Sequence, residues 1–193
     1  MASSNAGKIR EIEALLDGLG IEVVAQSALG VSDADETGKT FAENSLIKAR
    51  HASGATGLPA IADDSGLTVD ALDGRPGVYS ARYAGIDATD DENIDKLLEE
   101  LADVSDESRG AAFHCVATLV LPGRPTAIVA EGVWRGKILR SRKGDGGFGY
   151  DPVFLDPASN LSSAELTPEE KNSRSHRGQA LRELVALLKE QFS

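Results

Sequence analysis

The feature that most constrains the fold is an apolar run that ends in two adjacent carboxylates, within LPAIADDSGLTVDAL at residues 58–72. This stretch predicts a buried strand that turns at Ser65-Gly66 and resumes as a second strand. Side chains alternate along a strand, so Asp63 and Asp64 are expected to point to opposite faces. One carboxylate could bind a divalent cation while the other orients water or takes a proton, as metal-assisted phosphoryl chemistry requires. The alternative is an Asx-type turn in which Asp64 accepts backbone amides.

Helical and strand patterns alternate along the rest of the chain. Apolar residues at helical spacing predict a helix over residues 9–19, and the β-branched stretch IEVVAQ predicts a strand at residues 21–26. Two capping boxes, TFAE at residues 40–43 and TDDE at residues 89–92, start further helices, the first of which is expected to reach about His51. The remaining elements expected are strands at 110–121 and 126–134 joined by a PGRP turn, a helical turn at 167–171 that starts with Pro168, and a last apolar helix. This order predicts an α/β protein with a mixed sheet and helices packed on it.

The acidic charge limits the classes of partner. The chain of 193 residues has a formal net charge of −11, which argues against general binding to nucleic acids or acidic membranes, because both need a basic surface. A polyanionic ligand would need local lysines and a metal ion. The single cysteine, Cys115, cannot form an intramolecular disulfide, and no apolar run in the sequence is long enough to span a membrane. We therefore expect one globular domain over residues 1–193, in the cytoplasm, with no nucleic-acid or membrane partner.

Two polar loops could contribute to a phosphate or metal site. SSNAGK at residues 3–8 looks like half of a phosphate-binding loop, in which a helix start and Lys8 would meet the anion. It is not a Walker loop, because it lacks the GxxxxGK[ST] pattern. SDADETGK at residues 32–39 carries Asp35 and Glu36, which could join the carboxylate strand if the loop folds over its end. An acidic loop by itself is usually only solvated.

The glycine-rich stretch GDGGFGYDP at residues 144–152 has the GxGxxG spacing of a dinucleotide fingerprint. The fingerprint requires a helix after the glycines, whereas here Asp151-Pro152 leads into a strand. One interpretation is a flexible loop that presents Phe148 and Tyr150 to a flat group such as a nucleobase, with Asp151 nearby. The alternative is a glycine-rich turn whose aromatic side chains pack in the core.

The last motif, SRSHRGQAL at residues 173–181, places His176 and Arg177 where the last apolar helix begins. Positive charge at a helix start opposes the helix dipole, which is a small local cost that a function could explain. Ordinary polar surface is the alternative interpretation. His51, His114 and Cys115 are expected to be structural, because none has a partner at the spacing of metal ligands.

Seven segments taken together resemble the inosine triphosphate pyrophosphatase family, in order and over nearly the whole chain. They are SSNAGK, DETGKTFAENSLIKA, IADDSGL, GRPGVYSARYAG, GGFGYDPVF, AELTPEEKN and SHRGQAL. The resemblance implies hydrolysis of the non-standard purine nucleoside triphosphates dITP, ITP and XTP to the monophosphate and pyrophosphate. It also implies an elongated mixed β-sheet flanked by helices, two lobes around a central nucleotide cleft, and a homodimer.

The resemblance implies a role for each matching residue. Asp64 matches the catalytic carboxylate that also meets Mg²⁺, Asp63 stands beside it, and either Asp35 or Glu36 would be a second metal ligand. The substrate-binding residues implied are Ser3, Ser4, Asn5, Ala6, Gly7, Lys8 and Lys48 for the phosphates, Ser65 as a further contact, Phe148, Gly149, Tyr150 and Asp151 around the base, and Lys171, His176 and Arg177 at its edge.

The implied mechanism is attack on the α-phosphorus by a water that Asp64 activates, with Mg²⁺ and the lysines offsetting negative charge. Hydrogen-bond donors facing the 6-oxo group of the purine would reject adenine. Family members carry a short hydrophobic strand before the phosphate loop, whereas here only Met1-Ala2 precede it. Either the numbered start lies inside the true gene product, or the sheet lacks most of one strand, and weakened stability is expected of a chain truncated there. Two rival functions stay open at this point, namely a pyrophosphatase for modified pyrimidine nucleotides and a protein that binds a triphosphate without cleaving it.

Overall fold

The structure, a computed structural model, describes residues 1–2, 7–9, 12–13 and 21–192. The chain forms two compact units, each assembled from segments far apart in the sequence. Unit 1 consists of Met1–Ser65, Cys115–Gly132 and Ser175–Ser193, and unit 2 consists of Gly66–His114 and Val133–Arg174. That these units make up one functional domain stays a prediction.

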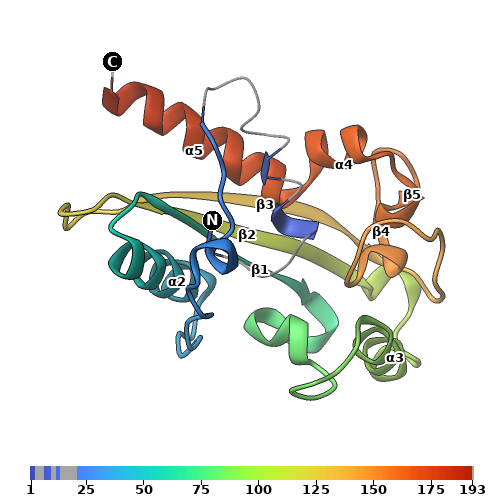
Figure 1. The fold of residues 1–193 in the computed structure, drawn as a ribbon. Coiled ribbons are helices and arrows are strands. Elements are labelled where there is room, and N and C mark those ends of the chain that lie inside the picture. The colour runs from blue at the N-terminus through green and yellow to red at the C-terminus, as the bar shows by residue number, and fades with distance from the viewer. Residues whose placement is uncertain (3–6, 10–11, 14–20, 193) are drawn as a thin grey trace. The chain divides into compact units, whose positions relative to one another are not determined.

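A five-stranded sheet in the order β1-β2-β3-β4-β5 and several helices confirm the expected α/β fold (Figure 1). The strands are β1 (Ala60–Val69), β2 (Gly110–Val120), β3 (Ile128–Ile138), β4 (Phe154–Asp156) and β5 (Leu161–Ser162), and the helices are α2 (Phe41–Thr56), α3 (Asp90–Glu100), α4 (Pro168–Arg174) and α5 (His176–Phe192). Short 3₁₀ helices are η1 (Gln26–Leu29), η2 (Asp70–Leu72), η3 (Gly77–Arg82), η4 (Asp106–Ser108), η5 (Asp151–Val153) and η6 (Ser163–Glu165). β4 pairs antiparallel with both β3 and β5.

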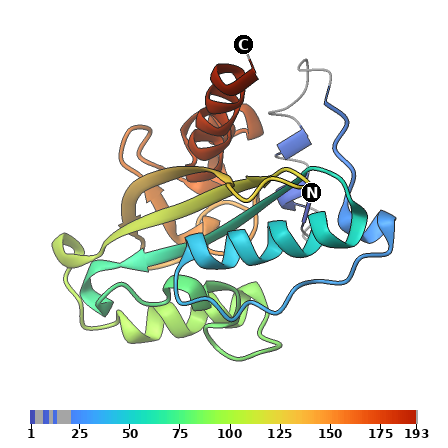
Figure 2. The ribbon, with the colours of Figure 1, turned by 90° about the vertical axis from the view of Figure 1, so that its left-hand side faces the viewer.

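In unit 1, α2 and α5 cover opposite faces of the strands (Figure 2). Strand alternation is the cause, because successive residues of β2 face opposite sides. One core cluster joins Cys115, Ala117 and Leu119 of β2 with Leu181 and Leu184 of α5. A second cluster on the other face joins the alanines of α2 with those of β1, namely Ala49, Ala52, Ala60 and Ala62.

In unit 2, aromatic side chains fill the core. Phe113 of β2, Trp134 of β3 and Phe154 of β4 are buried, and the ring centroids of Phe113 and Phe154 lie 4.5 Å apart. Tyr150, 5% exposed, belongs to the same core cluster. The loop that contains Tyr150 is therefore anchored in the aromatic core of the unit.

The capping boxes begin their helices as predicted. Thr40 accepts from the Glu43 amide at the start of α2, and Thr89 accepts from the Glu92 amide at the start of α3. α2 continues beyond the expected end near His51, to Thr56. Pro168 is the first residue of α4, as expected. None of the helices among the described residues is long and apolar enough to cross a membrane.

The turn expected at Ser65-Gly66 is wrong, and so is the Asx-turn alternative. β1 runs without interruption from Ala60 to Val69. Leu67 and Val69 are fully buried in the core of unit 2, so the apolar burial that follows the serine and glycine outweighs their preference for turns.

The strand expected at residues 21–26 is also wrong. Residues 21–25 have no regular secondary structure, and Gln26 begins η1. These residues make two backbone contacts with Met1: the Met1 amino group donates to the Val24 carbonyl at 2.7 Å, and the Gln26 amide donates to the Met1 carbonyl at 3.0 Å. The helix expected over residues 9–19 is seen at the described positions 7–9 and 12–13, and the rest of it lies outside the described residues.

Candidate active site

The two adjacent carboxylates face opposite sides of β1, as the alternation of a strand predicts. Asp63 faces the side that α5 covers, where Arg177 contacts it, and Asp64 faces the side that α2 covers, where Lys48 contacts it. A single strand therefore places two acids in two different surroundings within unit 1.

Asp63 is 1% exposed and holds two cations. Its Oδ2 lies 3.0 Å from the Lys8 ammonium and 3.3 Å from Nε of Arg177, and it accepts from the Ser65 hydroxyl at 2.9 Å. Burial alone would raise the pKa of Asp63, but the charges of Lys8 and Arg177 outweigh burial and hold the pKa well below its ordinary value. Asp63 is therefore a permanent anion that fixes the positions of Lys8 and Arg177.

Asp64 shares one cation with a second acid. The Lys48 ammonium lies 2.8 Å from Oδ1 of Asp64 and 2.9 Å from Oε1 of Glu36, and the side-chain amide of Asn44 donates to Oδ2 of Asp64 at 3.3 Å. Burial raises the pKa of Asp64, and although Lys48 opposes this, the negative charge of Glu36 adds to it. Asp64 therefore holds a proton more readily than an ordinary aspartate does, which suits a general base.

The start of α2 aims its side chains at Asp64. The capping box begins the helix at Phe41, and Asn44 and Lys48 are four residues apart, so both lie on one face. Gly38 donates its amide to the Asn44 side chain at 2.8 Å, and a Cβ at Gly38 would lie 2.6 Å from that side-chain oxygen. The glycine thus lets the acidic loop close on α2. The capping box was a signal for this face, but the sequence interpretation missed Asn44.

The acidic loop contains the two candidates for a second metal ligand, Asp35 and Glu36. Glu36 pairs with Lys48, whereas Asp35 is exposed. Asp33, in the same loop, accepts a hydrogen bond from the side-chain amide of Gln26.

The carboxylates of Asp64 and Glu36 fit a hard divalent cation. Both bind one ammonium group, so their oxygens converge on a common positive charge. Within the described ranges, no group of three or more histidine, cysteine or acidic side chains could hold a metal ion. One or two protein carboxylates, completed by water and phosphate oxygens, are the usual set for Mg²⁺, so the two carboxylates are sufficient.

His176 and Arg177 are buried, at 6% and 2% exposed, which rules out the polar-surface alternative. They begin α5, which packs closely on β3 at Gly132. A Cβ at Gly132 would lie 2.0 Å from the His176 carbonyl oxygen, so only glycine allows this approach. Gly132 therefore sets the position from which Arg177 reaches Asp63.

In unit 2, Asp151 organises the glycine-rich loop. It is 3% exposed and accepts at Oδ2 from the Lys171 ammonium at 2.7 Å and from the Phe148 amide at 2.8 Å, and at Oδ1 from the Ser163 hydroxyl at 2.8 Å. The Lys171 ammonium lies 4.7 Å from the centroid of the Phe148 ring. The Tyr150 side chain packs in the core instead and donates to the Ser80 carbonyl at 2.8 Å, so for Tyr150 the core alternative is correct.

The structure describes some of the remaining predicted residues and not others. Ser3, Ser4, Asn5 and Ala6 lie outside the described residues, while Gly7 is described in a helical segment with Lys8. The Gly149 amide donates to the Asp90 carboxylate at 2.7 Å, a contact that the sequence interpretation did not foresee. Of the three residues expected to be structural, His51 contacts the Ser32 carbonyl and His114 contacts the Thr68 hydroxyl, each at 3.0 Å. Cys115 is buried, and burial raises its pKa to about 12.

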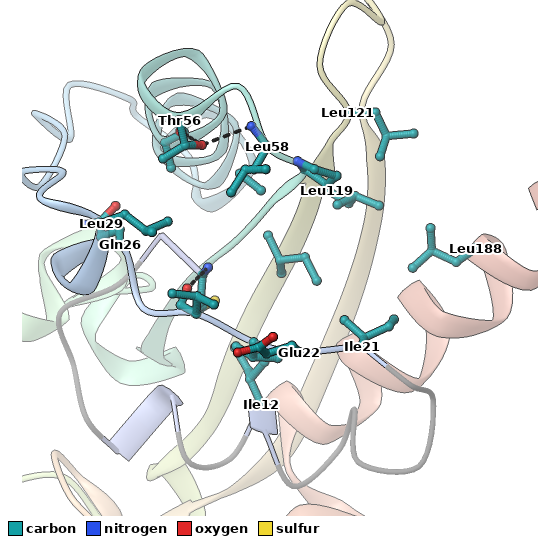
Figure 3. Close-up of a pocket in the computed structure, with 17 residues that line it drawn as sticks. Ile12, Ile21, Glu22, Gln26, Leu29, Thr56, Leu58, Leu119, Leu121 and Leu188 are labelled. Atoms are coloured by element: carbon teal, nitrogen blue, oxygen red, sulfur yellow. Dashed lines mark hydrogen bonds between the residues drawn. The ribbon is translucent and has the colours of Figure 1, made fainter.

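A separate pocket of about 420 Å³ in unit 1 is mainly apolar (Figure 3). Leu119 and Leu121, Leu188 of α5, and Leu58 after α2 contribute to its lining. Asp63 and Asp64 are not among the described residues that line it. The pocket therefore does not have the charges that a triphosphate requires.

Comparison with known proteins identifies the family of this chain. The Ham1 family model matches residues 1–187. A protein named dITP/XTP pyrophosphatase from Escherichia coli O157:H7 is 56% identical over 98% of this chain and 96% of the relative, and one of the same name from Methylococcus capsulatus is 57% identical over 98% and 94%. The structure of a HAM1 protein from Coxiella burnetii superimposes with a TM-score of 0.89 at 51% identity, covering 97% of this chain and 96% of that one. The Ham1 protein of Staphylococcus aureus gives a TM-score of 0.88 at 40% identity, covering 98% and 97%. The family resemblance seen in the sequence is therefore confirmed, and the chain belongs to the Ham1 family.

Proposed function

We propose that this protein hydrolyses the non-standard purine nucleoside triphosphates dITP, ITP and XTP to the monophosphate and pyrophosphate, with Mg²⁺ as cofactor. The observation that carries the proposal is that the Lys48 ammonium lies 2.8 Å from the Asp64 carboxylate and 2.9 Å from the Glu36 carboxylate. Two carboxylates and a lysine thus lie together. The relatives named dITP/XTP pyrophosphatase, more than half identical over nearly the full length, support the same activity and the choice of substrate class.

Asp64 and Glu36 would hold Mg²⁺, and the exposed Asp35 would not. When bound, the ion supplies positive charge that polarises the phosphoryl oxygens and offsets the acidity of the protein. Lys48 would then be released from the two carboxylates to contact the triphosphate.

Asp64 would accept a proton from the attacking water. As the water oxygen bonds to the α-phosphorus, the bond from that phosphorus to the oxygen of the β-phosphate breaks, and pyrophosphate leaves. Lys8 and Lys48 would stabilise the charge that develops on the departing pyrophosphate, and Arg177 stays a predicted contact at the edge of the base.

Asp63 would act as a positioning residue. It is fully buried between Lys8 and Arg177, and its low pKa keeps it ionised at any physiological pH. It therefore fixes the positions of both cations, of which Lys8 is the predicted phosphate contact.

The base would bind at the loop that Asp151 organises in unit 2. Phe148 offers a partly exposed ring, and Lys171 offers an ammonium that would donate to the 6-oxo group of hypoxanthine or xanthine. A 6-amino group is itself a donor, so adenine would leave both donors unsatisfied. Ser65, Gly149, His176 and the segment at residues 3–7 stay predicted substrate contacts.

The resemblance also suggests a cytoplasmic homodimer. Light scattering on the purified protein would test the dimer, because the mass of a dimer is twice the chain mass of 20.3 kDa.

One experiment tests the function. Pyrophosphate release is measured with Mg²⁺ from ITP, dITP, XTP, GTP, ATP and a modified pyrimidine triphosphate, for the wild type and for Asp64→Asn. We expect turnover of the first three, little of the others, and a loss of about 10²-fold to 10⁴-fold for Asp64→Asn. Binding of ITP without turnover would favour the non-hydrolytic rival, preference for the pyrimidine would favour the other rival, and an undiminished Asp64→Asn enzyme would contradict the proposed base.

A further inference from the structure

The short helix α4 depends on side-chain contacts for its position. It spans Pro168–Arg174, which is too short to be stable alone in water. Its start is secured by Thr167, which accepts from the Glu170 amide at 3.2 Å and donates its own amide to the Glu170 carboxylate at 3.0 Å. Its end is secured by Arg174, whose guanidinium donates to Asp156 at 2.8 Å.

Asp156 is a fixed point in unit 2. Its side chain is 4% exposed and accepts from the indole of Trp134 at 3.1 Å, and from the Ser159 amide and hydroxyl at 3.0 and 2.8 Å. Its partners lie on β3, in the turn after β4, and at the end of α4. Because three of these four bonds do not involve Arg174, the carboxylate stays in place while the arginine docks on it.

Lys171, on the same helix, reaches the glycine-rich loop. Its ammonium lies 2.7 Å from Asp151 and over the Phe148 ring. Lys171 and Arg174 are three residues apart, so they lie near each other on the helix surface. A shift at the end of α4 would therefore move the ammonium away from Asp151 and the ring.

We propose that Asp156 and Arg174 are positioning residues for base recognition, which hold α4 so that Lys171 stays at the loop of Phe148 and Asp151. This inference rests on the proposed function. Neither residue contacts the substrate. The Arg174 side chain is 34% exposed and lies outside the apolar core. A substitution there therefore removes the ion pair without leaving a cavity in the core.

The test uses Arg174→Gln, Asp156→Asn and the double variant. Asparagine retains one acceptor oxygen, so it keeps either the bond from Trp134 to Oδ1 or the bonds from Ser159 to Oδ2, and it removes the charge that Arg174 meets. Glutamine retains much of the length of arginine. In steady-state kinetics with ITP and Mg²⁺, we expect KM to rise about three- to tenfold in each single variant while kcat stays nearly unchanged. The KM of the double variant is expected to be no higher than that of the more affected single variant. Arg174→Lys, which retains the charge, is expected to restore part of the loss.

Two controls separate base recognition from general damage. Inorganic tripolyphosphate, which has no base, is expected to inhibit wild type and variants with the same inhibition constant. Asp106→Asn breaks another arginine pair of unit 2, Arg140 to Asp106 at 2.6 Å, where both side chains are more than half exposed, and it is expected to leave KM for ITP unchanged.

The outcomes are distinguishable. An unchanged KM for ITP in Arg174→Gln would overturn the inference, as would a lower melting temperature with no change in KM. A change of equal size for ITP and tripolyphosphate would also overturn it, because the effect would then not concern the base. If the wild type itself hydrolyses none of ITP, dITP and XTP, the proposed function fails instead.

Discussion

Two clusters of buried acids and cations lie in the two units, and they use their carboxylates differently. In unit 1, Asp63 and Asp64 bind the ends of long cationic side chains, Lys8, Arg177 and Lys48. In unit 2, Asp151 binds one cation, Lys171, and also a backbone amide and a hydroxyl.

This difference indicates how each cluster can interact with a bound ligand. The Lys48 ammonium can leave its carboxylates for a phosphate at little cost to the backbone, because the lysine stem is flexible, whereas Asp63 keeps Lys8 and Arg177 in place. A carboxylate that holds a backbone amide fixes the shape of a loop, and the loop then presents a constant surface. We therefore expect substitutions in unit 1 to act on chemistry and metal binding, and substitutions in unit 2 to act on base binding.

Among the variants that test this comparison, the largest effect is expected for Lys48→Gln. The variant removes the cation shared by Asp64 and Glu36, so kcat for ITP should fall by about 10²-fold to 10³-fold, as for loss of one charge-stabilising donor. Lys39→Gln, which changes an exposed lysine just before α2, is the control and should retain wild-type kcat. Equal losses in the two variants would mean that net charge, rather than the position of Lys48, governs the rate.

The next effect concerns the choice between the two acids of the loop. Glu36→Gln should raise the Mg²⁺ concentration for half-maximal activity by about tenfold or more, because it removes a carboxylate that converges with Asp64. Asp35→Asn should leave this concentration unchanged, because Asp35 is exposed. Magnesium titrations of ITP hydrolysis measure both, and the reverse order of effects would assign the metal to Asp35.

A smaller effect is expected for Gly147→Ala in unit 2. Gly147 has φ +76°, and a Cβ there would lie 2.0 Å from the Asp151 carboxylate, so alanine should displace Asp151 and raise KM for ITP several-fold. Gly30→Ala is the matched control, because Gly30 has a similar φ of +71° with nothing within 4 Å of the added Cβ. Both variants should lose about 1 kcal/mol of stability from backbone strain, and the control should retain its KM. An equal rise of KM in both variants would contradict the proposed role of Asp151 in base binding.

The smallest effect concerns the pH dependence of stability through Asp156. Burial alone would raise the pKa of this carboxyl, but hydrogen bonds from Ser159, Trp134 and Arg174 prevail and lower it. A depressed pKa in the folded state stabilises the protein above the ordinary pKa near 3.9, and this stabilisation is lost as pH falls through the folded value. The melting temperature of Asp156→Asn should therefore lie about 2 °C below that of wild type at pH 7 and approach it near pH 3. If the difference in melting temperature is the same at pH 7 and pH 3, the loss of stability arises from packing and not from the charge of Asp156.

Local rules were sufficient for several elements. The capping boxes at Thr40 and Thr89 and the proline at the start of α4 were predicted from a few neighbouring residues, because caps and proline act within one helical turn. Local rules failed at Ser65-Gly66 and at residues 21–26. At Ser65-Gly66, burial against distant segments outweighed the local preference for a turn. At residues 21–25, the β-branched residues form no strand.

The sequence by itself determined the types of chemical group that this protein carries and the alternation that separates Asp63 from Asp64, since both follow from residue identity and from the twofold repeat of a strand. Only the tertiary structure decided which partners those groups meet. Asp63 meets Arg177 across 114 residues of sequence, Asp64 meets Asn44 across 20, and Glu36 rather than Asp35 turns toward Lys48. Such contacts depend on how whole elements pack, because packing sets the distances between residues far apart in the chain, and no local pattern contains that information.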